Sequence, residues 1–159
     1  MNRIFGWLLI ATCFLLLVMI VPGSATHWFR QGAGRTYAIQ REAGVSHEEA
    51  ARQGHTVGLI FSSCMVFGIP LPVFGLLSIV TAVLFGLYPD SFRALIGGLF
   101  VALSLGGWAF LGVAQHLLVP HESVFTSFVA TGFIWLAIAF VFAVPLAIHY
   151  VIRRVRKNA

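Results

Sequence analysis

Histidine is the residue type whose placement in this sequence best suggests chemistry. His55 and His116 each lie near the end of a long apolar stretch, so two antiparallel helices would bring them to similar depth. Facing imidazoles can ligate the iron of haem b from both sides, or bind Cu or Zn with His121 as a further ligand. His55 and His116 are therefore the candidate cofactor-binding residues, and His55, His116 and His121 are the candidate metal ligands.

These histidines also have a simpler interpretation, as ordinary residues of a membrane interface. A histidine near a helix end can satisfy its ring nitrogens with water or a backbone carbonyl, and no spacing in the chain is specific for a metal site. Other chemistry lacks its usual residues, because no Asp, Glu, Lys or Arg lies deep within an apolar stretch. Cys13 and Cys64 lie in apolar stretches without a C-x-x-C motif, so we interpret them as small buried hydrophobic residues. Whether the protein is an enzyme stays open.

The composition predicts the elements that position these histidines. Hydrophobic residues make up 59% of the 159-residue chain and charged residues only 9%, whereas soluble domains carry about 25% charged residues. Runs of about 20 apolar residues span the hydrocarbon core of a bilayer. We therefore predict an all-α integral membrane protein, a single-domain up-down bundle of four transmembrane helices. The predicted spans are residues 4–21, 56–88, 92–119 and 123–152, with an extramembrane loop and helix extension at 22–55 and a basic tail at 153–159.

The first apolar run is expected to end at Pro22-Gly23, because both residues disfavour a helix interior. Residues 23–25 resemble a signal-peptide cleavage site. The apolar run of 18 residues is nevertheless longer than the ~7–15 residues usual in a signal peptide, so we expect a retained first helix. A loop is predicted to follow at residues 26–45.

Ser46 and Glu49 match a capping box, the reciprocal side-chain to backbone pairing that starts many helices. The match predicts that the second helix begins near His47, outside the membrane. Two polar turns would precede its entry into lipid near Thr56.

Pro70 and Pro72 interrupt the second predicted span. Because a proline removes a helical hydrogen bond and clashes with the preceding turn, either one kinked helix or two half-helices returning to the same side would result. Short loops join antiparallel neighbours, and the later spans are of similar length, so we favour one long, kinked helix. Freed carbonyls near the prolines, with Ser62 and Ser63, would suit a midplane site of the kind found in transporters.

Small residues recur at steps of three or four along the third predicted span, namely Gly98, Ala102, Gly106, Ala109 and Gly112. This spacing places them on one helix face and lets another backbone approach closely. His116 continues this face, and His55 lies one turn from Gly58 on a similar face of the second span. We expect these faces to form helix interfaces; the sequence leaves open whether the neighbour is in the same chain or in another subunit.

Basic residues predict the orientation. With both termini in the cytoplasm, six Lys and Arg side chains lie inside and four lie outside, as the preference for positive charge in the cytoplasm requires. The inner set is Arg3, Arg93, Arg153, Arg154, Arg156 and Lys157, and the outer set is Arg30, Arg35, Arg41 and Arg52. The net charge of +5 is thus interpreted as topology and contact with anionic lipid, not as nucleic-acid binding.

The sequence favours a non-enzymatic inner-membrane (plasma-membrane) protein that acts through helix–helix contacts, as an accessory or assembly subunit of a larger membrane complex. Its expected partners are the lipid bilayer and other membrane subunits or a second copy of itself, with no nucleic acid. One alternative is a haem- or metal-binding redox protein that uses the histidines of the outer face. A second alternative is a small-solute transporter with a midplane site at the kinked helix.

Overall fold

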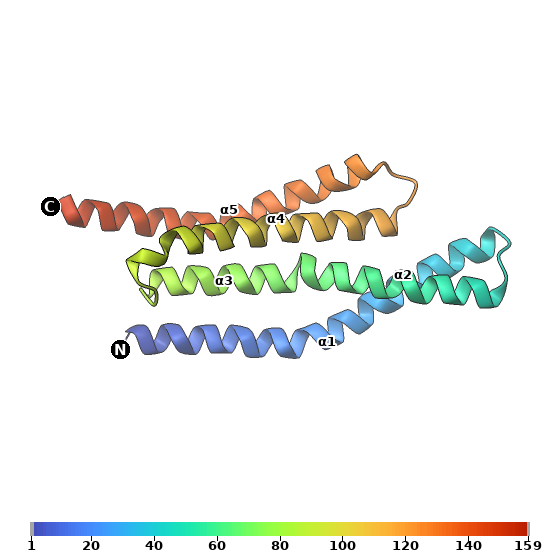
Figure 1. Cartoon of the computed structure of the whole chain (residues 1–159), viewed down its shortest axis with the longest axis horizontal. Coiled ribbons are helices and arrows are strands. Elements are labelled where there is room, and N and C mark those ends of the chain that lie inside the picture. The colour runs from blue at the N-terminus through green and yellow to red at the C-terminus, as the bar shows by residue number, and fades with distance from the viewer. Residues whose placement is uncertain (1, 159) are drawn as a thin grey trace.

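The computed structural model describes residues 2–158, with the side chains of residues 3–156. The regular elements in this part of the chain are all helical. They are α1 (Asn2–Glu42), α2 (His47–Gly68), α3 (Pro70–Leu84), the short 3-10 helix η1 (Asp90–Phe92), α4 (Arg93–Leu118) and α5 (Val124–Asn158). The helices pack lengthwise, and both ends of the described chain lie at the same end of the molecule as the α3–α4 connection (Figure 1).

Within residues 2–158, four helical stretches are long and apolar enough to cross a membrane. They are Arg3–Glu42, His47–Leu84, Asp90–Leu118 and Val124–Arg156. Large apolar side chains cover their outer surfaces, as Phe14 and Phe133 show with exposures of 66% and 69%. Such side chains need no protein cover in a bilayer, because lipid tails are as apolar as they are. The predicted all-helical fold with four potential membrane spans is confirmed.

The structure corrects the predicted end of the first helix. α1 continues through Pro22-Gly23 to Glu42 and is 41 residues long. The predicted extramembrane segment 22–55 is therefore mostly helical, and only residues 43–46 connect α1 to α2. Within this connection Gly44 has a φ of 81°, a left-handed conformation that glycine adopts without strain and that commonly ends a helix.

Packing against α2 explains why residues 22–23 do not end α1. Gly58 lies so close to α1 that an added Cβ would be 2.9 Å from the carbonyl oxygen of Phe29, and an added Cβ on Gly32 would be 2.9 Å from the Phe61 Cβ. A proline inside a helix costs about 3 kcal/mol. The contacts that the second half of α1 makes with α2 offset this cost, so tertiary packing overrides the local preference.

The predicted start of α2 is confirmed. Ser46 is the N-cap residue, and its hydroxyl accepts a hydrogen bond from the backbone N–H of Glu49 at 3.3 Å. The Glu49 carboxylate accepts hydrogen bonds from Arg52 at 2.8 Å and from Gln53 at 2.9 Å. These partners hold the Glu49 carboxylate along the helix. The capping box predicts instead that it reaches back to the backbone N–H of Ser46.

The two prolines divide the second predicted span. α2 ends at Gly68, Ile69 leaves helical geometry with φ −126° and ψ −76°, and α3 begins at Pro70. Pro70 occupies the first helical position, where a missing N–H breaks no intrahelical hydrogen bond. Figure 1 shows that α3 continues α2 in the same general direction, and together they form one apolar stretch of 38 residues.

Two small buried clusters join the helices. The first consists of Phe61, Cys64 and Ala114, and the second of Leu76, Leu111 and Trp135. Both cysteines are free and buried, as expected for small hydrophobic residues. Because lipid is as apolar as these side chains, close packing rather than exclusion from solvent holds such helices together.

Candidate functional site

His55 lies on α2, toward the end of the molecule with the α1–α2 connection. Its imidazole is exposed and packs edge-on against Phe29 of α1, with ring centroids 5.3 Å apart. The adjacent Gly54 also packs on α1, since an added Cβ would lie 2.8 Å from the carbonyl oxygen of Ala33. The sequence predicts that this face of α2 meets the third span, whereas in the structure it meets α1.

His116 lies near the end of α4 and is partly buried. Its Nδ1 atom is buried and has no hydrogen-bond partner among the described residues, and the same holds for Ser127 Oγ and Trp135 Nε1 on α5. A buried polar atom without a partner costs about 1–3 kcal/mol. A bridging water would satisfy such atoms, so they do not by themselves indicate a cofactor.

Contacts between α2 and α4 show the relative depth of the two candidate ligands. Gly68 lies against Leu111, and Ala114 packs in one cluster with the α2 residues one to two turns before Gly68, so the helices are antiparallel. In this register His116 lies level with about residues 61–63 of α2, and His55 lies about two turns beyond that level. With a rise of 1.5 Å per residue, the two histidines are separated by on the order of 10 Å along the helix axes. Helix packing therefore does not favour facing imidazoles.

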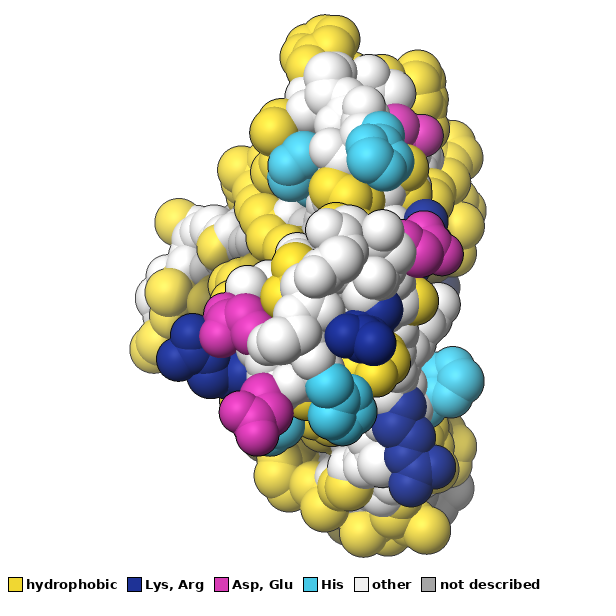
Figure 2. All heavy atoms as spheres, turned by 90° about the vertical axis from the view of Figure 1, so that its right-hand side faces the viewer, with side chains coloured by type: hydrophobic (Ala, Val, Ile, Leu, Met, Phe, Trp, Pro, Cys, Tyr) yellow, Lys and Arg dark blue, Asp and Glu magenta, His cyan; other side chains and the backbone are white. Residues whose placement is uncertain are grey.

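His121 is exposed in the connection between α4 and α5, beside Glu122. His47, at the start of α2, shares a hydrogen bond of 2.9 Å with the hydroxyl of Tyr37. Figure 2 views this end of the molecule and shows histidine side chains dispersed among acidic and basic ones. No group of three or more His, Cys, Asp or Glu side chains within the described chain is placed to bind a metal ion. Binding of haem, Cu or Zn by His55, His116 and His121 stays a prediction.

α4 uses two of its glycines for contacts within the chain. An added Cβ on Gly112 would lie 2.8 Å from the Phe128 ring of α5, and one on Gly107 would fall on the indole ring of Trp135. The Trp108 indole N–H also donates a hydrogen bond to the Phe128 carbonyl oxygen at 2.8 Å. These contacts place the C-terminal half of α4 firmly against α5.

The other small residues of α4 face away from the chain. An added Cβ on Gly98 or Gly106 would meet no described atom within 4 Å, and Ala102 and Ala109 are exposed. At 100° per residue these four positions fall within an arc of roughly 80°. We call them the outer small-residue face of α4. The sequence identifies this pattern but not the direction in which it points.

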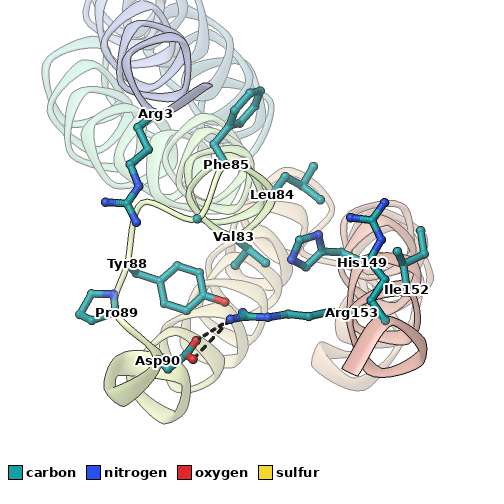
Figure 3. A pocket seen from close by; sticks show the side chains of 12 residues that line it. Arg3, Val83, Leu84, Phe85, Tyr88, Pro89, Asp90, His149, Ile152 and Arg153 are labelled. Carbon is teal, nitrogen blue, oxygen red and sulfur yellow. Dashed lines mark hydrogen bonds and ion pairs between the residues drawn. The ribbon is translucent and has the colours of Figure 1, made fainter. Parts of the chain in front are cut away.

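At the opposite end of the bundle, Asp90 binds arginines from two helices. Its carboxylate lies 2.6 Å from the Arg93 guanidinium. It also lies 3.2 Å from the Arg153 guanidinium of α5, as Figure 3 shows. The hydrogen bond from Arg93 and the charge of Arg153 hold the pKa of the Asp90 carboxyl below its usual value. Asp90 and Arg153 are 63 residues apart, so no local sequence pattern indicates that they meet.

No protein-family model, no curated protein and no solved structure matches this chain.

Proposed function

We propose that this chain is a small non-enzymatic protein of the inner (plasma) membrane and an accessory or assembly subunit of a larger membrane complex. It acts through helix–helix contacts, by docking α4 against a transmembrane helix of a partner subunit or of a second copy. One observation carries the proposal: the outer small-residue face of α4 has no partner among the described residues.

The chain itself illustrates what such a face does. Gly54 and Gly58 stand four residues apart on α2, and α1 approaches them so closely that an added Cβ on either would lie within 2.9 Å of a backbone oxygen. Gly98, Ala102 and Gly106 repeat the four-residue step on α4 without a neighbouring helix. The same pattern therefore supports a close helix contact at both places, one made within the chain and one made with a partner.

Helices associate in lipid for a different reason than in water. Exclusion of apolar surface from water does not drive association there, so close van der Waals packing between backbones must do so. A lipid-facing helix gains nothing from small side chains, whereas a docking helix gains a shallow groove. Leu99 and Leu105, both exposed, flank this groove and supply side chains for interdigitation.

Gly106→Leu is expected to weaken this association roughly tenfold or more without unfolding the chain. A bulky side chain in a close-packed helix contact costs about 1–3 kcal/mol, while the added Cβ meets no described atom of the chain itself. The measurement is chemical cross-linking in intact membranes, combined with native electrophoresis of mild detergent extracts. We expect the wild type in a larger species and the variant shifted toward the monomer.

Leu99→Ile is the control, because Leu99 is exposed at the edge of the small-residue face and the change conserves volume, so the face stays open. It should leave the larger species intact. A wild type that cross-links to nothing in its native membrane, or equal behaviour of Gly106→Leu and wild type, would refute the docking proposal.

We also propose that both termini lie in the cytoplasm. The end of the molecule that holds the termini carries Arg3, Arg93, Arg153, Arg154 and Arg156, and the far end carries the smaller outer set of four arginines. This asymmetry supports a cytoplasmic position for the termini.

A reporter that is active only in the cytoplasm tests the orientation. It should be active when fused after Ala159 or inserted near Ser91, and inactive when inserted at Gly44 in the α1–α2 connection, because an even number of crossings returns the chain to its starting side. Activity at Gly44 with silence at Ala159 would reverse the orientation.

A further inference from the structure

A cavity of about 560 Å³ lies where three separate parts of the chain meet. The start of α1 contributes Arg3, the α3–α4 connection contributes Asp90, and the last turns of α5 contribute His149, Arg153 and Arg156. Figure 3 shows the Arg3 and Arg153 side chains at this cavity, on opposite sides of the segment that ends α3. Residues from both ends of the sequence thus build one basic site.

The charges of this cavity are not balanced within the described chain. Asp90 is its only acidic lining residue and is already paired with Arg93 and Arg153. Arg3 and Arg156 make no ion pair with any described carboxylate. Two guanidinium groups are therefore available for an anion, and a guanidinium binds phosphate oxygens through paired hydrogen bonds.

A second cavity of about 450 Å³ adjoins the first and shares His149 and Arg153 with it. It extends between α4 and α5, where Ile96, Gly97 and Leu146 form its apolar part and Arg93 and Arg154 also line it. The combined site has a cationic end and an apolar groove beside it. A soluble phosphate would use only the first part, whereas a phospholipid would use both.

We propose that the two cavities bind one anionic phospholipid, with its headgroup in the cavity that Arg3 and Arg156 line and an acyl chain in the groove beside Gly97. The site lies at the end of the bundle that holds both termini and the α3–α4 connection, and lipid phosphates would lie near this end of helices that span a bilayer. Basic pockets between transmembrane helices bind anionic headgroups in this way. This inference is independent of the docking surface on α4.

Native mass spectrometry of the full chain in detergent tests the proposal. The chain is titrated with phosphatidylglycerol or with phosphatidylcholine of the same acyl chains, and the bound fraction is measured. Phosphatidylglycerol should be retained preferentially, and Arg3→Gln with Arg156→Gln should weaken its binding roughly tenfold. Arg30→Gln with Arg35→Gln removes the same charge from the second half of α1, toward the opposite end of the molecule. Salt screens the charges at that distance, so this double variant should change binding less than about twofold.

A second variant separates a lipid from a soluble phosphate. An added Cβ on Gly97 meets no described atom within 4 Å, so Gly97→Phe should fill the groove without disturbing the fold, which circular dichroism checks. It should weaken phosphatidylglycerol binding, and glycerol phosphate alone should bind far more weakly than the lipid. Equal binding of glycerol phosphate and lipid, equal losses in the two double variants, or no preference over phosphatidylcholine would overturn the proposal.

Discussion

Gly107→Leu should destabilise the folded chain by about 3 kcal/mol, at the upper end of the range for overpacking a core. An added Cβ at this position falls on the Trp135 indole, and Trp135 is buried against Leu76 and Leu111. The indole would have to leave this packed position, or α4 and α5 would have to separate. Helix content measured by circular dichroism during a titration from mild detergent into dodecyl sulfate gives the change in stability.

Gly106→Leu is the control for this measurement as well as the test of docking. The two glycines are neighbours in sequence, but an added Cβ on Gly106 points into space that no described atom occupies. Leucine also favours a helix by up to about 1 kcal/mol over glycine. We therefore expect Gly106→Leu to retain or slightly raise the stability of the monomer. Equal destabilisation by both substitutions would contradict the observed packing of α4 on α5.

Phe61→Ala should destabilise the chain by about 2 kcal/mol. Phe61 is fully buried, contacts α1 at Gly32 and packs with Ala114 of α4, so it joins three helices. Transfer of the side chain from lipid to protein contributes little, because both environments are apolar. The cavity contributes most: removal of roughly 100 Å³ at about 24 cal/mol per Å³ gives the expected value.

Phe133→Ala is the matched control, since the Phe133 side chain is 69% exposed on the lipid-facing surface of α5. It removes the same atoms without leaving a cavity inside the bundle. The same detergent titration should show a change of less than about 0.5 kcal/mol. A loss as large as that of Phe61→Ala would mean that the two phenylalanines do not differ in packing as described.

Several features of this protein were predictable from the sequence because their causes are local. The number of helices that can cross a membrane follows from apolar run length against the thickness of the hydrocarbon core. The start of α2 follows from the preference of Ser46 for an N-cap position, which depends on residues within one turn. Pro70 indicates an interruption of the second span but not its form: the sequence favours one kinked helix, whereas the structure has α2 and α3 divided at Ile69.

The end of α1 shows where local reasoning fails. Pro22-Gly23 disfavours a helix by itself, yet α1 continues to Glu42 because glycines of α2, such as Gly54 and Gly58, let α1 pack closely against it. The local preference of Pro22-Gly23 against a helix amounts to a few kcal/mol. Contacts of α1 with α2 residues some thirty positions away in the sequence outweigh it.

The candidate sites depended even more on the tertiary structure. The sequence identified the small residues of α4 and the histidines, but only the register between helices decided that Gly107 faces Trp135, that Gly106 faces outward and that His55 packs on Phe29. The meeting of Arg3, Asp90 and Arg153 has no local signal at all. In lipid, apolar patterning does not distinguish the inside of a bundle from its outside, so the rotation and depth of each helix are decided by long-range packing alone.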